Sequence, residues 1–358
     1  MISKIKNIIL QMVAGANIAT VIIMLIIGYS DRLHPTTLPL LANAGLIFPV
    51  FILLNLFFLV FWVIFKFRWV IIPLVGFIVC YQPVRNYCPL NITTETPDSA
   101  FKILSYNVWL FGSWEDPENN AIVKYIAEQD ADIACLQEAN ASGVGEKQIE
   151  KTINPVYQYR DTLKKGTGGT VLAFYSKHPI LRKQHIDFDS KGNMAGAVWL
   201  NVGGDTVIVV NTHFETTSLT SDDKAHFKQM MKGEYTSDSV ETTSRELYAK
   251  LKESTFKRAP QAEAVARFIA SHKEHPVICC GDFNDGPNSY AHRTIANELT
   301  DCYTASGNGP GISYHKSGFY VRIDNIFCSA DLDPIKCVVD DKITTSDHYP
   351  IICWLKKR

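Results

Sequence analysis

Polar residues suited to acid-base and metal chemistry stand at the ends of short apolar runs in the chain after residue 100. They comprise four carboxylates, two amides and two imidazoles: Asn107, Glu138, His213, Asp282, Asn284, Asp324, Asp347 and His348. Taken singly, a carboxylate after a strand is usually a turn residue or helix cap, and a lone histidine is usually structural. Strand ends can meet in one cleft, however, and together these groups suit metal-assisted attack of water on a phosphate.

The apolar runs themselves predict many strands with a few helices between them. Strands are expected at 102–108, 131–137, 170–175, 195–202, 206–212, 276–280, 323–328 and 350–355, and helices at 118–129 and 259–272. The chain has no G-x-G-x-x-G turn of the kind that binds a dinucleotide. The pattern therefore favours an α/β sandwich of two sheets over a doubly wound nucleotide-binding fold.

The order of the polar motifs resembles one known superfamily. Asn107 in the first strand is followed by LQE, NTH, GDFN, RID and SDH across residues 103–348. This series is similar to that of the endonuclease/exonuclease/phosphatase superfamily, whose members resemble deoxyribonuclease I. The resemblance implies a four-layer α/β sandwich, two packed β-sheets flanked by helices, in a catalytic domain at 101–358 that hydrolyses phosphoric esters.

The resemblance also implies a division of roles at the metal and the attacking water. Glu138 would be the principal Mg²⁺ ligand with Asn107 beside it, and Mn²⁺ could replace Mg²⁺. Asp347 would support the metal or orient its neighbours. His348 would be the general base, held in its tautomer and orientation by Asp324, because an imidazole beside a carboxylate is suited to work near neutral pH.

Three further residues are expected to face the phosphate. Asp282 would assist proton transfer or stabilise the leaving group. Asn284 would donate a hydrogen bond to a non-bridging oxygen, and His213 would donate to the developing charge from the other side.

The substrate is less well specified than the chemistry. Abasic-site endonucleases typically carry an acidic residue two positions after the first Asn, whereas this chain has Trp109, an arrangement closer to that of neutral sphingomyelinases. Trp109, Phe111 and Trp114 would then either form an apolar rim that binds substrate or pack a loop onto the core. The near-neutral formal charge of −1 does not choose between a phosphodiesterase on lipid head groups and a nuclease on nucleic acid. A non-catalytic binding domain of the same fold would predict a damaged motif, and none is damaged.

The first part of the chain predicts a membrane anchor. Apolar segments at 8–28, 41–65 and 69–84 are each expected to form a helix in an anchor at 1–86, followed by a linker at 87–100. The third segment is the doubtful one, because its 16 residues reach only about 24 Å against a hydrocarbon core of about 30 Å, and Pro73 weakens it. A buried helical hairpin fits poorly, since the segments are apolar on every face.

Basic residues beside these segments predict the orientation of the anchor in the bilayer. Lys4, Lys6, Lys66 and Arg68 fall on one side of the membrane if two helices separate them, and short basic segments tend to stay in the cytoplasm. A third crossing then places the catalytic domain outside the cytoplasm, on the extracytoplasmic face of the inner membrane if the source is bacterial. The lipid bilayer and a phosphoester are the expected partners, with nucleic acid possible and no protein partner.

Two other features leave alternatives open. The polar stretch 216–258 has helical patterns at 222–231 and 244–257, and it would be either a lid over the cleft or a solvated decoration. The nine cysteines lack metal-binding spacing, and several lie in apolar runs. We therefore expect buried thiols more than disulfides.

Overall fold

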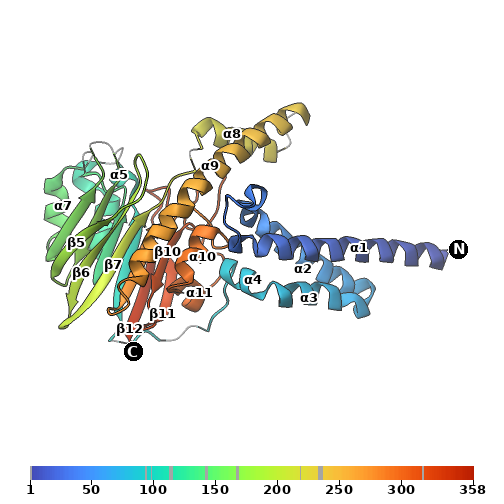
Figure 1. Cartoon of the computed structure of the whole chain (residues 1–358), viewed down its shortest axis with the longest axis horizontal. Helices are drawn as coiled ribbons and strands as arrows, with labels where there is room; N and C mark the ends of the chain where they lie inside the picture. Colours follow the sequence, from blue (N-terminus) through green and yellow to red (C-terminus); the bar gives the residue numbers. More distant parts are fainter. Residues whose placement is uncertain are drawn as a thin grey trace.

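A computed structural model of the chain describes residues 2–92, 95–97, 99–112, 116–141, 144–166, 169–217, 219–232, 237–316 and 318–358. A helical bundle formed by the N-terminal residues projects from an α/β domain formed by the rest of the chain (Figure 1). The N-terminus lies at the end of the bundle far from that domain. Both short connections on the opposite side, residues 29–47 and 88–92, lie against the α/β domain (Figure 1).

The bundle contains helices apolar enough to cross a membrane. They are α1 (Ile2–Gly28), α2 (Phe48–Phe65), and a bent pair, α3 (Ile71–Val79) and α4 (Tyr81–Tyr87). By length and composition there are two candidate spans among the described residues, or three if the pair, bent by 68°, forms one span. The predicted second helix at 41–65 begins later than expected, at Phe48, because a proline at its start favours initiation there. The residues before it form two short 3₁₀ helices, η2 (Pro39–Leu41) and η3 (Ala44–Ile47).

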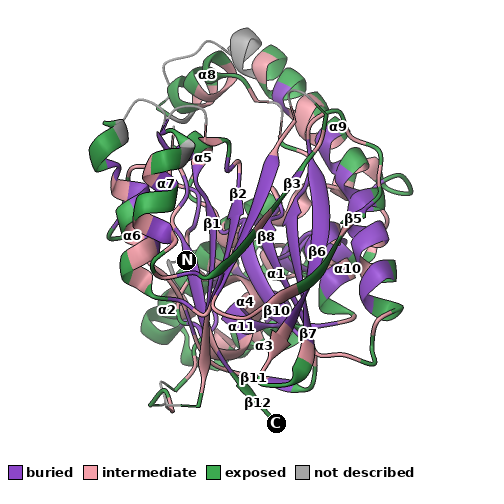
Figure 2. Ribbon diagram, turned by 90° about the vertical axis from the view of Figure 1, so that its left-hand side faces the viewer, coloured by how far each residue is buried: buried purple, intermediate pink, exposed green. Residues whose placement is uncertain are grey.

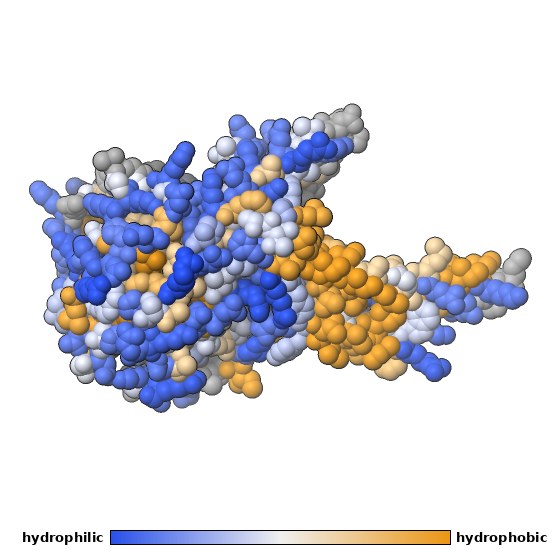
Figure 3. All heavy atoms as spheres, in the orientation of Figure 1, coloured by the Kyte–Doolittle hydropathy of each residue, from blue (hydrophilic) through white to orange (hydrophobic). Residues whose placement is uncertain are grey.

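Polar side chains inside the bundle connect its helices. Trp62 Nε1 donates to Asn17 Oδ1 at 3.0 Å, and Asn55 Nδ2 donates to the carbonyl of Pro73 at 2.9 Å. Asn17, Asn55 and Trp62 are fully buried, whereas most of the apolar side chains of α2 face outward (Figure 3). Hydrogen bonds of this kind hold helices together in a bilayer, where apolar burial between helices is not a driving force.

The α/β domain contains two six-stranded sheets. The first has the order β11-β12-β1-β2-β4-β3 and the second β5-β6-β7-β8-β10-β9. The strands of the first sheet are β1 (Phe101–Asn107), β2 (Ile133–Gln137), β3 (Tyr159–Lys164), β4 (Val171–Ser176), β11 (Leu332–Val339) and β12 (Ile351–Lys357). Those of the second are β5 (Ile180–Ile186), β6 (Met194–Val202), β7 (Asp205–His213), β8 (Val277–Asp282), β9 (Thr300–Asp301) and β10 (Asp324–Cys328).

Helices cover the outer faces of both sheets. On the first sheet lie α6 (Ala121–Gln129) and α7 (Glu146–Ile153); on the second lie α9 (Ser237–Ala270) and α10 (Tyr290–Ala296). Short helices α5 (Trp109–Gly112), α8 (Ser221–Met231) and α11 (Cys302–Ser306) occupy the loops. The central core between the sheets is formed by alternate strand residues such as Ile103, Val209 and Ile326 (Figure 2). The four-layer α/β sandwich expected from the sequence is therefore confirmed.

The sequence pattern found the buried strands and missed the exposed ones. All eight expected strands are present, with ends shifted by one or two residues. Strands β3 and β5 are exposed at most of their positions, and β11 contains Pro334 and a register shift, so none of them shows an apolar run. The helices expected at 244–257 and 259–272 are one helix, α9, which continues through Pro260. The cysteines are free thiols, and all but Cys88 are buried.

Candidate active site

The candidate site lies where strand ends of both sheets meet. In the second sheet, His213 at the end of β7 pairs with Asp282 at the end of β8, and Asp282 pairs with Asp324 at the start of β10. In the first sheet, Asn107 ends β1 and Glu138 follows β2, the neighbouring parallel strand. Burial of the flanking strand residues in the core fixes this register, so side chains far apart in sequence converge.

Unusual backbone geometry accompanies this convergence. Glu138 and Asn284 have φ angles of 53° and 51°, values that L-residues adopt uncommonly. Gly281 has a φ of 137°, and a Cβ there would lie 2.0 Å from the carbonyl oxygen of Thr212. Only glycine fits at this position, so Gly281 allows β8 to approach β7 just before it presents Asp282.

Asn107 links two of the carboxylates. Its Nδ2 donates to Glu138 Oε1 at 3.3 Å and to Asp282 Oδ2 at 3.0 Å, while its Oδ1 accepts from the backbone N–H of Trp109 at 3.1 Å. Both side-chain ends of this buried amide are therefore used. Asn107 orients Glu138 and Asp282 toward one another across the gap between the two sheets.

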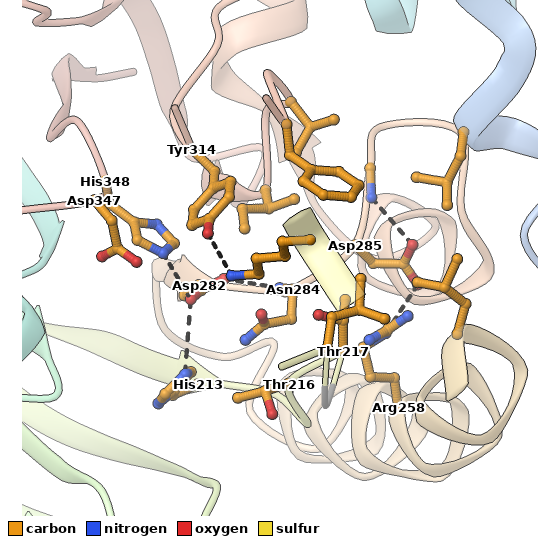
Figure 4. Close-up of a pocket in the computed structure, with 18 of the residues that line it drawn as sticks. His213, Thr216, Thr217, Arg258, Asp282, Asn284, Asp285, Tyr314, Asp347 and His348 are labelled. Carbon is orange, nitrogen blue, oxygen red and sulfur yellow. Dashed lines mark hydrogen bonds and ion pairs between the residues drawn. The ribbon is translucent and has the colours of Figure 1, made fainter. Parts of the chain in front are cut away.

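His213 faces the same pair of carboxylates. Its Nε2 lies 3.6 Å from Asp282 Oδ2 (Figure 4) and equally far from Glu138 Oε1. Its Nδ1 lies 3.0 Å from Thr170 Oγ1. Burial lowers the pKa of His213, so its neutral form is favoured. If the hydroxyl of Thr170 donates to Nδ1, the proton resides on Nε2 and points at the carboxylates.

His348 forms a dyad with Asp324. Its Nδ1 lies 2.7 Å from Asp324 Oδ2, and its Nε2 lies 3.7 Å from Asp282 Oδ2 on the other side of the ring. Burial alone would lower the pKa of His348, but the charges of Asp324 and Asp282 outweigh burial and raise it well above the ordinary value. Both ring nitrogens thus face carboxylates, an arrangement that stabilises the protonated ring after it has accepted a proton.

Burial also raises the pKa values of two carboxylates toward neutral pH. It raises the pKa of Glu138, and it raises the pKa of Asp282 to about 6, although the charge of His348 acts to lower both pKa values. One ligand atom each from Asp282, Asp324 and His348 lies within 4.8 Å of the others, a grouping that could hold a metal ion. The site therefore concentrates acidic groups that either share protons or bind a cation.

The remaining predicted residues lie around this centre. Asn284 donates its Nδ2 to the carbonyl of Phe214 at 3.0 Å, and its backbone N–H donates to Asp282 Oδ1 at 2.8 Å. Asp347 is half-buried and lines the pocket in front of the site. Trp109 is half-buried beside Asn107, Phe111 is fully buried in the core, and Trp114 lies outside the described residues. Phe111 therefore packs the loop onto the core and does not form a rim.

Several residues of the site carried no sequence signal that we recognised. Thr170 contacts His213, Ser346 Oγ donates to the carbonyl of Asn107 at 2.7 Å, and Ser313 Oγ accepts from the backbone N–H of Asp324 at 3.0 Å. Isolated Ser and Thr residues are too common in turns to be noticed. The position of Ser346, two residues before His348, could have indicated that it belongs to the site. Its Oγ accepts a hydrogen bond from the backbone N–H of His348 at 3.2 Å.

A pocket of about 250 Å³ opens in front of these groups (Figure 4). One side of it is formed by Glu138, His213, Asp282, Asn284 and His348. The polar stretch 216–258 contributes Thr216, Thr217, Leu219, Lys224, Leu251 and Arg258 to its walls. The described part of this stretch thus forms part of the pocket wall. It is not an insertion that contacts only solvent.

Sequence comparisons match the α/β domain and the bundle to two different family models. Residues 104–348 match the Endonuclease/Exonuclease/phosphatase family, and residues 10–87 match a domain of unknown function (DUF8431). A curated relative is the CCR4-Not complex 3'-5'-exoribonuclease subunit Ccr4 of Emericella nidulans, 26% identical over 276 residues. That alignment covers 60% of this chain and 40% of the relative, so the chain spans well under half of that protein.

Solved structures with a similar fold cover the α/β domain. The human Nocturnin catalytic domain with bound sulfate has a TM-score of 0.52 at 14% identity and covers 74% of this chain and 97% of its own. TDP2 of D. rerio complexed with single-strand DNA product has a TM-score of 0.51 at 15% identity, covering 73% and 100%. Truncated TDP2 of Caenorhabditis elegans has a TM-score of 0.50 at 17% identity, covering 73% and 100%. At these identities the likeness concerns the fold alone.

Proposed function

The chain belongs to the endonuclease/exonuclease/phosphatase family, and on that basis we propose that it is a membrane-anchored, divalent-metal-dependent phosphodiesterase acting on lipid head groups. The observation that carries the chemistry is the cluster of Glu138, His213, Asp282 and His348 around one pocket. The observation that carries the membrane location is the pair of long apolar helices, with a bent third pair, joined to this domain.

The residues present fit a hard divalent cation. Glu138 supplies a carboxylate oxygen 3.3 Å from Asn107 Nδ2, and Asp324 Oδ1 is a buried oxygen without a hydrogen-bond partner among the described residues. Among the described residues that line the pocket there is no cysteine. Such a donor set suits Mg²⁺ or Mn²⁺. We assign Glu138 as the principal ligand, with Asn107 beside it and Asp347 in support; a bound cation would offset the charge that develops on the phosphate.

His348 is the proposed general base. In the neutral ring Nδ1 donates to Asp324, which fixes the tautomer in which Nε2, on the pocket side, accepts a proton. Water attacks phosphorus, its proton passes to Nε2, and the bond from phosphorus to the leaving oxygen breaks. The imidazolium so formed lies between Asp324 and Asp282, which stabilise its charge.

Asp282, Asn284 and His213 are the proposed phosphate-side groups. The raised pKa of Asp282 lets it hold a proton nearer neutral pH than an ordinary aspartate, which suits transfer to the leaving oxygen. His213 Nε2 has no hydrogen-bond partner among the described atoms, so it can donate to the phosphate. The Nδ2 group of Asn284 has a second N–H besides the one that bonds Phe214.

A nuclease is the second candidate, because the relative from Emericella nidulans is named as an exoribonuclease. A groove of about 900 Å³ next to Glu138 contains Arg160 and Lys164, which could follow a nucleic-acid backbone. Arg160, however, forms an ion pair at 2.7 Å with Glu150, which lines the same groove, so much of its charge is neutralised. This local balance supports the lipid phosphodiesterase over the nuclease.

The test is a substrate panel on the full chain purified in detergent, with Mg²⁺ present. DNA, RNA, choline phospholipids and inositol phosphates are compared, and Glu138→Gln serves as the inactive control. Hydrolysis of a phospholipid that Glu138→Gln abolishes is the expected result. Cleavage restricted to RNA or DNA would establish the nuclease instead. A complete lack of hydrolysis of every ester would favour a binding domain.

A further inference from the structure

The pocket has an apolar end that the proposed catalytic groups do not use. Besides the carboxylates and histidines, the pocket is lined by Leu46, Leu219, Leu251, Phe319, Val321 and Ile323. These come from three separate parts of the chain: the connection between α1 and α2, the stretch 216–258, and the loop before β10. Such a wall would have no evident use for a substrate that is polar throughout, because it offers no hydrogen bonds to it.

Leu46 is notable because it belongs to the membrane anchor. It lies in η3, part of the connection 29–47, and this connection contacts the α/β domain at several points. Thr255 Oγ1 donates to Asn43 Oδ1 at 2.7 Å, and the hydroxyl of Tyr248 donates to the carbonyl of Pro39 at 2.7 Å. A Cβ added at Gly45 would lie 2.2 Å from the carbonyl oxygen of Asn288, so the two backbones are in close contact there. The anchor is therefore docked and completes the pocket wall.

The apolar end also lies close to the point where the chain would enter the bilayer. Leu46 is two residues before Phe48, the first residue of α2. The outer face of α2 is strongly exposed, with Leu53 66% and Ile64 68% accessible, as expected of a lipid-facing helix. Apolar side chains around η3 continue this surface up to the α/β domain (Figure 3). The apolar wall and the membrane surface are consequently adjacent.

Charge within the pocket fits an anionic group between its two ends. Arg258 is neutralised by Asp285, whose Oδ2 lies 3.1 Å from its Nε. Lys224 from α8 instead donates to the neutral hydroxyl of Tyr314 at 2.7 Å (Figure 4). Tyr314 packs edge-on against His348, with ring centroids 5.1 Å apart. The ammonium group of Lys224 thus lies close to the proposed general base, where it would attract a phosphate.

We propose, building on the proposed phosphodiesterase function, that the site takes its substrate from the bilayer. The lipid phosphate lies between Lys224 and the carboxylate cluster, and the first part of its apolar substituent lies along Leu46, Leu251 and Val321. A nucleobase is a poorer occupant, because this wall is largely aliphatic and Phe227 already stacks on Phe319 at 4.7 Å. Leu46 of the anchor is then a specificity-determining residue for the catalytic domain.

The experiment compares two substrates with the full chain in detergent. One is a long-chain phospholipid mixture of phosphatidylcholine, phosphatidylglycerol and phosphatidylethanolamine in mixed micelles, and the other is bis(p-nitrophenyl) phosphate, a small soluble diester. Leu46→Gln is expected to lower the ratio of kcat/KM for lipid to kcat/KM for the small diester by about tenfold or more, because a polar group replaces an apolar wall. Leu40→Gln is the matched control: this residue lies in the same connection, is 76% exposed and does not line the pocket, and should keep the wild-type ratio.

A second variant guards against misreading the result if Leu46→Gln fails to fold. Leu251→Gln alters the same wall from α9 and should lower the same ratio, so agreement between the two variants does not depend on the anchor alone. An unchanged ratio in both variants would overturn the inference. Wild-type protein that hydrolyses the small diester but no phospholipid would contradict both this inference and the lipid substrate of the proposed function, whereas lipid hydrolysis with an unchanged ratio would contradict the inference alone. Wild-type protein that hydrolyses none of these esters would instead contradict the proposed function itself.

Discussion

Asp324 accepts a hydrogen bond from His348 Nδ1 at 2.7 Å, and both residues are buried. Asp324 is the first residue of β10. Its backbone N–H donates to Ser313 Oγ, and this bond holds in place the backbone that carries the carboxylate. His348 lies in the loop before β12, where its own N–H donates to Ser346 Oγ. Two separate serines thus hold the two partners of the dyad in position.

Removing the carboxylate of this dyad should impair catalysis through the histidine. Asp324→Asn leaves the shape nearly unchanged but removes the charge and the control of tautomer, so kcat should fall by about tenfold to a hundredfold. His348→Ala should cost at least about a hundredfold. The double variant should be little worse than His348→Ala, because the two residues act as a unit. Additive losses in steady-state kinetics would mean that they act independently.

Metal dependence follows from the oxygen-rich donor set. Glu138→Ala should lower kcat by at least about a hundredfold and should weaken Mn²⁺ binding, measured by electron paramagnetic resonance or calorimetry. Glu128→Gln, an exposed glutamate on α6, is the control and should bind Mn²⁺ as the wild type does. Full activity after exhaustive EDTA treatment would refute metal dependence.

Lys224, which lies in the stretch 216–258, is expected to bind the anionic substrate. Lys224→Ala should raise KM for a phosphodiester by about tenfold, equivalent to about 1.4 kcal/mol, because a charge-assisted contact to phosphate is lost. Lys228→Ala removes an exposed lysine one turn later on α8 and should leave KM unchanged. Equal effects in the two variants would show that only the general charge of α8 matters.

Asp301 should stabilise the fold at neutral pH and lose this effect in acid. Burial alone would raise the pKa of Asp301, but the hydrogen bond from His292 and the charge of Arg322 outweigh burial and lower it. A lowered folded-state pKa adds stability above the unfolded pKa of about 3.9, and that stability is lost as pH falls toward the folded value. Asp301→Asn should therefore cost about 2 kcal/mol near pH 7 and less in acid.

Unfolding of the full chain in detergent across pH measures this difference. Asp205→Asn is the control, because Asp205 is exposed and its pair with Lys357 lies on the surface. Surface pairs contribute about 0–1 kcal/mol. A constant difference between Asp301→Asn and wild type from acid to neutral pH would contradict the linkage.

The anchor should cross the membrane three times, with the α/β domain outside the cytoplasm. Lys66 and Arg68 lie between α2 and α3, at the end of the bundle that also carries the N-terminus (Figure 1). If the host is a Gram-negative bacterium, protease added to intact spheroplasts should remove the domain while cytoplasmic markers survive. Cleavage only after permeabilisation would show that the bent pair α3 and α4 does not cross, and it would place the site away from outer-leaflet lipids.

The sequence by itself determined the class of fold and most of the groups around the candidate site. The buried strands show as apolar runs because both of their faces lie in a core, and edge strands such as β5 remain invisible because they are exposed. Glu138, Asp282 and His348 could be singled out because each follows or precedes such a run. Their roles in catalysis stay predictions for the experiments above.

Only the tertiary structure decided which other residues contact the predicted site residues. Thr170 reaches His213 across 43 positions of sequence, and Thr255 reaches Asn43 across 212. Sequence periodicity reports which face of a strand or helix is buried, but it carries no information on which distant segment packs against that face. For this reason the polar half of the pocket could be anticipated from motifs. Its apolar lining, to which Leu46 of η3 and Leu251 of α9 both contribute, emerged only when the packed elements fixed the distances between them.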